Sequence, residues 1–207
     1  MFRDRQQAGK RLAEELQKRG ITGDIVLAVP RGGLPVGHAV AEAMGLGLDI
    51  VVARKMGAPG NPELAIGAVA SDGSVWRNDR LIQQLGVDED YVERTRRQEA
   101  ENARAKFDRY RGDRPEPELS GKTVLIVDDG VATGATTIAC IRLAYSEGAE
   151  RVILAVPVAP PESVKRLQQE ADQVIAVDQP TWFMAVGQFY EQFGQVSDEE
   201  AMAYLEP

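Results

Sequence analysis

The fold is decided by the stretch VLIVDDGVATGATT, which occupies residues 124–137. Its first four residues are apolar and three of them are β-branched, which predicts a strand that is buried on both faces. Two acids end this strand, and a small, hydroxyl-rich loop leads into a helical run over residues 138–147. A corner of this kind points backbone N–H groups at the start of the helix, where a phosphate binds.

The two acids, Asp128 and Asp129, are unexpected in such a corner because carboxylates repel phosphate. They make sense if the ligand also carries a diol, since two carboxylates can accept hydrogen bonds from two hydroxyls. A phosphate beside a vicinal diol describes ribose 5-phosphate. The alternative is an ordinary turn whose acids only favour the helix N-terminus. A P-loop fits worse, because no Lys follows Gly134.

This segment resembles the signature of the type I phosphoribosyltransferases, which bind 5-phosphoribosyl-1-pyrophosphate (PRPP). In that family two acids contact the ribose hydroxyls and the following loop wraps the 5-phosphate. The resemblance implies that Asp128 and Asp129 bind the ribose and act as catalytic residues. It also implies a 5-phosphate loop made of Gly130, Val131, Ala132, Thr133, Gly134, Ala135, Thr136 and Thr137.

A second glycine-containing segment, Val29-Pro30-Arg31-Gly32-Gly33, follows the first predicted strand. Glycines let the backbone approach a ligand, and ligands of open α/β folds bind at the carboxyl edge of the sheet. In the family this position is the pyrophosphate loop, often with a cis peptide before its first Gly, so Arg31–Gly32 is the expected cis bond. The resemblance implies a diphosphate site made of Arg31, Gly32, Gly33, Arg54 and Lys55, with Arg31 and Lys55 also catalytic.

Each of these basic segments also has a plainer interpretation. Arg31 could be an exposed residue in an ordinary turn, and Arg54-Lys55 could protect the end of a strand that we expect over residues 48–53. Arg nevertheless suits a diphosphate through its bidentate fork, and Lys acts as a compact point charge. The combination of these residues with the acid pair is therefore more informative than any single member.

The chain also resembles a bacterial group of predicted phosphoribosyltransferases along most of its length. The segments that carry this resemblance are Arg-Asp-Arg at 3–5, Val29–Gly33, Arg54-Lys55, residues 57–69 and the tail 183–200. This resemblance does not supply an acceptor. Enzymes that act on 6-oxopurines usually have an Asp directly before the loop Thr, and here Ala132 stands there, as in the adenine and uracil enzymes.

The aromatic residues of the tail suggest where an acceptor would bind. Six of the chain's twelve aromatic residues lie in the last 26 positions, after the final predicted strand. They must fold back over the sheet, as the variable hood of the family does, and planar heterocycles stack well on aromatic rings. Trp182 and Phe183 lie nearest the end of that strand and are the predicted acceptor site. The alternative is that these rings only complete the core.

Composition narrows the function further. The net charge of -8 and the isoelectric point near 4.9 argue against a nucleic-acid partner, whose phosphates require a basic surface. A single cysteine, Cys140, excludes an internal disulfide and is expected to be a small core residue. The N-terminus lacks the apolar segment of a signal peptide, and the longest apolar runs are strand-length. We therefore expect a cytoplasmic protein without a membrane partner.

The order of elements predicts an α/β fold with a five-stranded, mainly parallel sheet flanked by helices. We expect one domain over residues 1–207, with a core at about 20–55 and 121–178, an insertion at about 56–120 and a C-terminal hood at about 179–207. The insertion should hold a Gly- and Pro-rich mobile loop at 56–62 and a hairpin whose turn is Ser71-Asp72-Gly73. The other expected elements are helices at 4–19, 34–44, 88–110 and 162–171 and strands at 24–29, 48–53, 124–127, 151–158 and 173–177.

The expected function is transfer of 5-phosphoribosyl from PRPP to a nitrogen of a nucleobase-like acceptor, with release of diphosphate. The resemblance implies Mg²⁺ bound with PRPP, mainly through ligand oxygens and water, and the sequence assigns no metal ligands. A homodimer is compatible with this interpretation. Two alternatives stay open: a PRPP-sensing regulator without turnover, and an unrelated α/β protein that binds phosphosugars.

Overall fold

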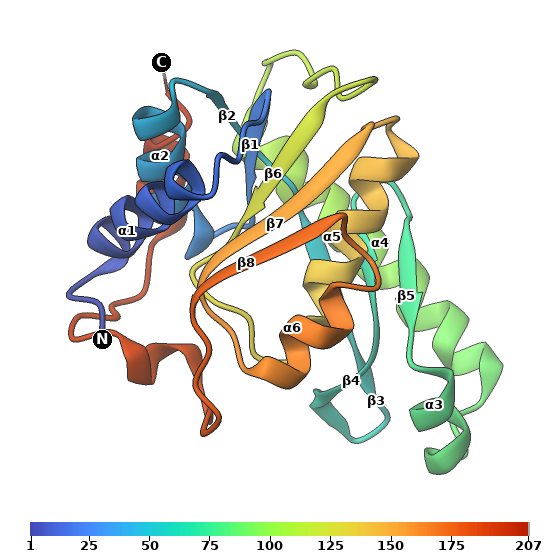
Figure 1. Cartoon of the computed structure of the whole chain (residues 1–207). Helices are drawn as coiled ribbons and strands as arrows, with labels where there is room; N and C mark the ends of the chain where they lie inside the picture. The colour runs from blue at the N-terminus through green and yellow to red at the C-terminus, as the bar shows by residue number, and fades with distance from the viewer. Residues whose placement is uncertain (207) are drawn as a thin grey trace.

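A computed structural model describes residues 1–206 and shows a five-stranded parallel sheet at its centre (Figure 1). The strand order is β2-β1-β6-β7-β8, and every neighbouring pair is parallel. This confirms the predicted fold class. The strands are β1 (Ile25–Ala28), β2 (Gly47–Ile50), β6 (Thr123–Val127), β7 (Arg151–Val158) and β8 (Gln173–Asp178).

Helices cover both faces of this sheet (Figure 1). α1 (Arg5–Lys18) and α2 (Gly33–Met44) lie on one face, and α5 (Ala135–Ser146) and α6 (Pro161–Leu167) lie on the other. Because successive strand residues point to opposite faces and both faces are covered, the interior of the central strands β1, β6 and β7 is apolar. In β6, for example, Leu125 packs with α1 and α2, whereas Ile126 packs with α5.

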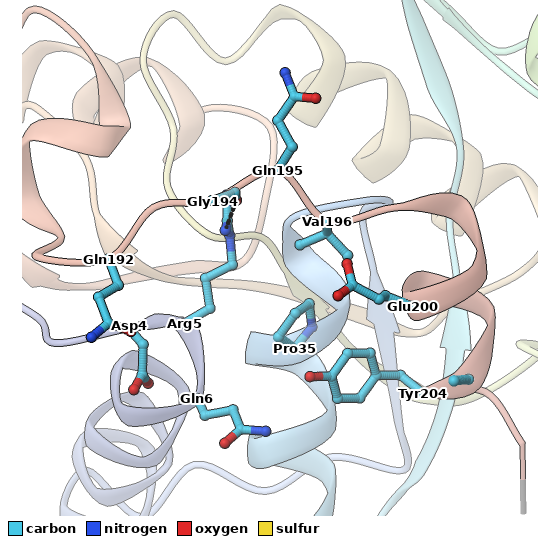
Figure 2. Close-up of a pocket in the computed structure, with 11 residues that line it drawn as sticks. Asp4, Arg5, Gln6, Pro35, Gln192, Gly194, Gln195, Val196, Glu200 and Tyr204 are labelled. Atoms are coloured by element: carbon cyan, nitrogen blue, oxygen red, sulfur yellow. Dashed lines mark hydrogen bonds between the residues drawn. The ribbon is translucent and has the colours of Figure 1, made fainter.

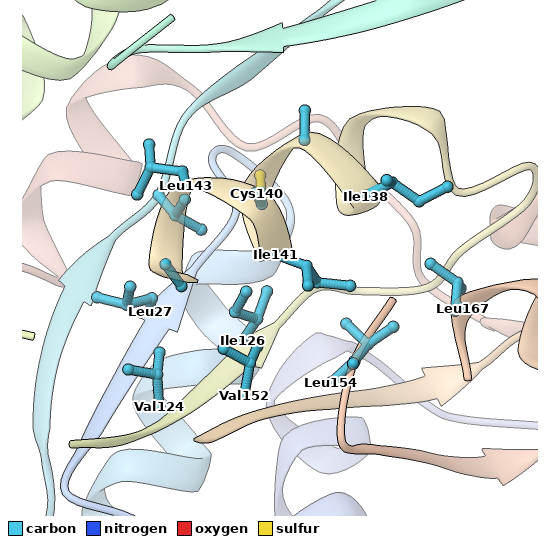
Figure 3. Close-up of a cluster of buried hydrophobic side chains, with 14 of the residues drawn as sticks. Leu27, Val124, Ile126, Ile138, Cys140, Ile141, Leu143, Val152, Leu154 and Leu167 are labelled. Atoms are coloured by element: carbon cyan, nitrogen blue, oxygen red, sulfur yellow. The ribbon is translucent and has the colours of Figure 1, made fainter. Parts of the chain in front are cut away.

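The core on the α5 face is made mainly of aliphatic side chains from the central sheet and from α5 and α6 (Figure 3). Leu27, Ile126 and Leu154 of the sheet meet Ile138 and Ile141 of α5 there. Cys140 is fully buried in the same cluster, as the sequence predicted. Both the strand and the helix that flank the acid pair are therefore anchored in the core.

A smaller antiparallel sheet of order β3-β4-β5 is inserted after β2 (Figure 1). Its strands are β3 (Ala53–Ala58), β4 (Asn61–Ala70) and β5 (Val75–Arg77), and it is followed by α3 (Asp79–Leu85) and the long α4 (Glu89–Arg111). The predicted hairpin at 71–73 and the long helix are confirmed. Within the described residues, no helix is long and apolar enough to cross a membrane.

Two expectations about this region are wrong. The segment 56–62 is not an irregular loop, because β3 and β4 pair across it with register shifts at Met56–Ala58. An added Cβ on Gly57 would lie 2.6 Å from Pro62 Cα, so glycine permits the close approach of the two strands. The strand expected over 48–53 ends at Ile50, and Ala53 already belongs to the inserted sheet.

The C-terminal tail folds back to the start of the chain. After β8 it forms the short 3₁₀ helix η1 (Val186–Phe189) and then α7 (Asp198–Ala203). The Phe2 N–H donates to Phe189 O at 2.7 Å, and the rings of Phe2 and Tyr190 lie 5.4 Å apart. These contacts hold the tail against the carboxyl ends of β7 and β8, where Val158 joins the same apolar cluster.

Candidate active site at the carboxyl edge of the sheet

The two predicted binding segments lie side by side because β1 and β6 are neighbouring parallel strands. Ala28 pairs with Val127, so the loop 29–33 and the acids that follow Val127 leave the sheet at the same edge. The approach is very close: a Cβ added to Gly32 would lie 2.0 Å from Asp129 Oδ2. Gly33 is similarly restricted, since its Cβ would lie 2.9 Å from Val127 O. Both glycines are therefore required by the packing of the loop against the acids.

The cis peptide bond in this loop is Pro30–Arg31 and not the predicted Arg31–Gly32. Gly32 already has helical angles, with φ -62° and ψ -29°, and it caps α2. The Gly33 N–H donates to Val29 O at 3.0 Å, and the Leu34 N–H donates to Arg31 O at 3.1 Å. The Arg31–Gly32 peptide thus belongs to the entry into α2, and the cis bond falls one residue earlier.

The acid pair is largely enclosed by protein. Asp128 accepts a hydrogen bond from the Asp129 N–H at 2.8 Å. Asp129 accepts one from Arg5 Nε at 2.8 Å, and the side chains of this ion pair are only 12% (Arg5) and 14% (Asp129) exposed. Tyr190 donates its hydroxyl to the Asp129 carbonyl at 2.6 Å. The tail and α1 therefore both fix Asp129.

The environment separates the two acids electrostatically. Burial raises the pKa of Asp128 well above its usual range, and the neighbouring Asp129 carboxylate raises that pKa further. Burial also raises the pKa of Asp129, but there the Arg5 guanidinium opposes the shift. The pair therefore takes up its first proton at a higher pH than an isolated aspartate would, and Arg5 favours the ionised form of Asp129.

Arg5 is a site residue that sequence reasoning did not identify. It is the first residue of α1, its Nη1 donates to Gly194 O at 2.7 Å, and its guanidinium carbon lies 3.9 Å from the centre of the Phe193 ring. The Arg-Asp-Arg segment at 3–5 contributed to the family resemblance, but the resemblance assigned no role to Arg5. One signal was present, because a cation in the first turn of a helix is unfavourable unless something else binds it.

The loop 130–137 offers donors to a ligand. Gly134, with φ 80°, caps α5 without a side-chain hydrogen bond. Within the described residues 1–206, the backbone N–H groups of residues 134–137 donate to no protein acceptor. Ser163 of α6 donates to Ala132 O and so holds the loop from outside. Ala132 and Thr133 are exposed, which leaves this face of the loop open to a ligand.

The basic residues do not all converge on one point. Arg54 and Lys55 lie in β3 of the inserted sheet rather than at the end of β2, and successive strand residues point to opposite faces. Arg54 accordingly pairs with Glu99 of α4 at 2.8 Å. Lys55 pairs with Glu63 at 2.9 Å and lines a cavity with Thr133. The expectation of one adjacent basic pair at the end of β2 is therefore wrong.

A lysine of α4 reaches the loop 29–33 instead. Lys106 donates to Pro30 O at 3.2 Å. Burial lowers its pKa, and the positive charge of Arg31 lowers that pKa further. Sequence reasoning did not identify Lys106, because acids and basic residues are interleaved along α4 and give no indication of which cation turns inward. Arg31 itself lies 3.6 Å from Asp198 of α7 (Nη1 to Oδ1).

The structure separates the two aromatic residues that were predicted to hold an acceptor. Trp182 is 73% exposed, whereas Phe183 packs on Phe189 with ring centres 5.0 Å apart. The tail aromatics that reach the acid pair are Tyr190 and Phe193, through the Asp129 carbonyl and Arg5. A periodic pattern could not identify them, because the segment that follows β8 is mostly irregular.

A cavity of about 630 Å³ lies beside Arg5, between the start of α1, the first turn of α2 and the tail (Figure 2). Its lining mixes apolar residues with three amide side chains, Gln6, Gln192 and Gln195, at its edges, and Tyr204 lies at one side. Arg5 belongs both to this cavity and to the acid pair. Among residues 1–206, no group of three or more His, Cys, Asp or Glu side chains is arranged to hold a metal ion.

Comparison with known proteins gives a consistent result. Residues 3–193 match the phosphoribosyl transferase domain family. A Mycobacterium tuberculosis (strain H37Rv) protein named "Putative phosphoribosyl transferase Rv0571c" is 39% identical over 206 residues, which cover 100% of this chain and 46% of that protein. The chain thus spans about half the length of this curated relative.

A solved structure is similar along the whole chain. The crystal structure of TT1426 from Thermus thermophilus is 44% identical, covers 99% of this chain and 97% of its own, and superposes with a TM-score of 0.84. A ribose-phosphate pyrophosphokinase from Sulfurisphaera tokodaii is 41% identical over 81 residues, which are 39% of this chain and 26% of that protein.

Proposed function

The chain belongs to the phosphoribosyl transferase domain family, and we propose from this premise that it transfers 5-phosphoribosyl from PRPP to a nitrogen of a nucleobase-like acceptor. The observation that carries the proposal is the corner between β6 and α5. There a largely enclosed acid pair lies directly before a loop in which the backbone N–H groups of residues 134–137 have no acceptor within the described residues. A diol and a phosphate in one ligand satisfy both features.

Each part of PRPP has a proposed position. The ribose hydroxyls bind Asp128 and Asp129, and the 5-phosphate binds the N–H groups of the loop 130–137. The diphosphate binds the loop Arg31–Gly33, where Arg31 and Lys106 provide positive charge. Support for this arrangement comes from the contact of Gly32 with Asp129, which leaves the diphosphate loop and the ribose acids next to each other.

Mg²⁺ fits this site as a partner of PRPP rather than as a resident ion. Two carboxylates face the diphosphate loop, and Mg²⁺ commonly binds through one or two carboxylates together with substrate phosphates. Asp128 and Asp129 are the residues that would lie nearest to it. When bound, Mg²⁺ offsets the negative charge of the departing diphosphate.

The side chains would act by position and charge. Arg31 and Lys106 stabilise the diphosphate as the bond from C1 to its oxygen breaks, and the acid pair faces the positive charge that develops on the ribose. The loop 130–137 holds the 5-phosphate, so C1 stays aligned with the acceptor nitrogen. Tyr190 and Arg5 keep the acids in place through the bonds to Asp129.

We propose two alternative positions for the acceptor. Trp182 and Phe183 stay the predicted stacking residues, and the amide-lined cavity beside Arg5 is the other position from which a heterocycle could approach the ribose. Measuring the KM of the acceptor separates the two positions. Trp182→Ala and Phe183→Ala raise it if the first is right, whereas Gln195→Ala raises it if the second is right. PRPP affinity should be unchanged in all three variants.

One observation favours a second candidate, a regulator that binds PRPP without turnover. Arg5 forms an ion pair with Asp129, so one of the two acids is already neutralised and is less able to stabilise positive charge on a ribose. Release of diphosphate from PRPP across a panel of nucleobases separates the candidates. The transferase releases diphosphate with at least one base, whereas the regulator binds PRPP in calorimetry and releases none. A chain that binds no PRPP would contradict both.

The organisation of the chain stays a proposal as well. We propose that residues 1–207 act as one domain, with the inserted segment and the tail as covers on the core, and that the chain forms a homodimer. The family match over residues 3–193 supports the first part, because it spans core, insertion and most of the tail. Analytical ultracentrifugation would test the second.

A further inference from the structure

We propose that Arg166, together with Lys55, supplies the positive charge of a phosphate-binding cavity beside the loop 130–137, and that this cavity holds the 5-phosphate of the phosphoribosyl donor. The cavity has a volume of about 410 Å³ and lies between the inserted sheet, the start of α5 and α6. The residues that line it include Lys55, Trp76, Asn78, Thr133, Ala135 and Arg166. The second half of the inference rests on the proposed function.

Two contacts fix α6 against the loop 130–137, one before and one after Arg166 in the sequence. Ser163 donates its hydroxyl to Ala132 O. Leu167 packs on Gly134, where an added Cβ would lie 3.3 Å from the nearest Leu167 atom. With both neighbours held, Arg166 is positioned at the loop by the body of the helix. Figure 1 shows α6 beside the lower end of α5, opposite the hairpin of β3 and β4.

In the part of the chain that the structure describes, one nitrogen of the half-buried Arg166 side chain lacks a hydrogen-bond partner. Its Nε is buried, and within residues 1–206 it finds no hydrogen-bond acceptor. An unpaired buried donor is costly, and the cost is larger for a charged group. Arg142 provides the contrast, because its Nε and Nη2 both donate to Glu170, at 3.1 and 2.9 Å. An anion in the cavity would accept hydrogen bonds from the Arg166 guanidinium, as the Glu170 carboxylate does from Arg142.

Lys55 provides the second charge from the opposite wall. Its present partner, Glu63, is 89% exposed, and such surface pairs are weak. Lys55 can therefore exchange Glu63 for a phosphate oxygen at little cost. Asn78 already uses its Oδ1 to accept from the Leu81 N–H, which leaves its amide N–H groups as donors. The lining of the cavity thus combines two cations and neutral donors with one carboxylate, that of Glu63, which is mostly exposed and already paired with Lys55.

A phosphate monoester fits these features better than a carboxylate or a diphosphate. The cavity adjoins Thr133 and Ala135, whose loop follows the acids proposed to bind a diol. A ligand that spans both must carry a phosphate and two hydroxyls on one small skeleton. Arg is suited to this role because its planar fork binds two phosphate oxygens at once.

The test measures binding of ribose 5-phosphate and of inorganic diphosphate by calorimetry, with the full chain. Arg166→Met should weaken ribose 5-phosphate by about tenfold or more, because a charge-assisted hydrogen bond is lost, and should leave diphosphate affinity unchanged. Arg166→Lys should recover part of the loss. Arg142→Met is the matched control, and it should change neither affinity by more than about twofold.

Equal affinity of wild type and Arg166→Met for ribose 5-phosphate would overturn the inference. An equal loss of affinity for ribose 5-phosphate and for diphosphate would also overturn it, since the effect would then not be specific to the 5-phosphate. If Arg166→Met does not fold, Arg166→Gln, which keeps a polar side chain but removes the charge, carries the same expectation and the same contradicting results.

A separate measurement distinguishes this inference from the proposed function. Trp76 lines the cavity, and the chain has only one other tryptophan, Trp182. In a Trp182→Phe background, inorganic phosphate should change the Trp76 fluorescence, and Arg166→Met should remove that change. If wild type binds phosphate in this way but neither PRPP nor ribose 5-phosphate, the cavity is a phosphate site and the proposed transferase function is wrong. No change in the fluorescence would refute the cavity as a phosphate site.

Discussion

The acid corner at the end of β6 and the inserted sheet β3-β4-β5 present charge to the same region in different ways. In the acid corner, Asp129 and Arg5 form a nearly enclosed pair that neighbouring main-chain groups hold in place. On the inserted sheet, Arg54 and Lys55 are partly exposed and pair with acids at the surface. Protein groups thus hold the charges of the corner in place, whereas the inserted sheet offers charges that a ligand can redirect.

This difference implies that substitutions have unequal effects. Substitutions in the corner should have large effects, because the neighbouring groups there have little room to move and little solvent to replace a lost partner. Changes on the inserted sheet remove pairs that water replaces, so they should be small unless the ligand itself is contacted. We therefore expect the largest losses in the corner and the smallest on the inserted sheet.

Gly32→Ala should have the largest effect. The new Cβ would lie 2.0 Å from Asp129 Oδ2, although the backbone angles of Gly32 suit alanine, so the steric clash alone is tested. Displacing the loop or the acid by about 1 Å should lower PRPP affinity by about 100-fold. Gly47→Ala is the control, because nothing lies within 4 Å of its added Cβ. Calorimetric affinity within a factor of two of wild type for Gly32→Ala would show that the acid corner is not tightly packed.

Arg5→Met should destabilise the protein by about 1–3 kcal/mol, because Asp129 then lies in a nearly enclosed position without its cation. Arg11→Met is the matched control from the same helix, since Arg11 is more exposed and approaches Asp178 only to 3.9 Å. Chemical unfolding of the two variants measures the difference. An equal loss in both would mean that enclosure contributes nothing to the Arg5–Asp129 pair.

Asp128→Asn should stabilise the protein at neutral pH. The pKa of Asp128 is raised in the folded state by burial, so between the unfolded and folded pKa values the folded state binds more protons. Wild-type stability therefore falls as the pH rises through this window, and the asparagine variant escapes that loss. The stability difference should vanish below the unfolded pKa and reach a plateau above the folded one. Melting temperatures across the pH range would contradict this if the difference grew on acidification.

The smallest effects should come from two single variants, Lys106→Met and Arg54→Met. Lys106 contacts the Pro30 carbonyl of the diphosphate loop, so its loss should weaken diphosphate binding by roughly tenfold. Arg54 pairs with Glu99 at the surface, and its loss should change the same affinity by less than about threefold. If Arg54→Met were the more damaging variant, the inserted sheet would contribute to the diphosphate site more than its present contacts indicate.

The parts of the site that were predictable from sequence are those attached directly to parallel strands. The strand 124–127, its acids and the loop after them follow from local pattern, because a buried strand and a helix start leave few alternatives. The position of Arg31 followed for the same reason, although the cis bond lies one residue earlier than expected. Main-chain geometry alone determines where these residues lie.

The remaining residues depend on tertiary packing. Arg5, Lys106 and Tyr190 reach the site from α1, α4 and the irregular tail, each far from the acids in sequence. Their local patterns describe an amphipathic helix, a charged helix and a loop, and none of these patterns indicates which polar residue turns inward. Arg54 and Lys55 were misplaced because the chain leaves the central sheet at Ile50, a boundary that the continuous apolar run to Ala53 conceals.

The most direct test of the account is PRPP binding by the double variant Asp128→Asn, Asp129→Asn. The account predicts that wild type binds PRPP and that the double variant stays folded but binds it more weakly by roughly 1.5–3 kcal/mol, because charged hydrogen bonds to the ribose hydroxyls are lost. Circular dichroism establishes that the variant is folded, and calorimetry gives the affinity. Unchanged PRPP affinity in a folded double variant would contradict the assignment of the acid corner to the ribose.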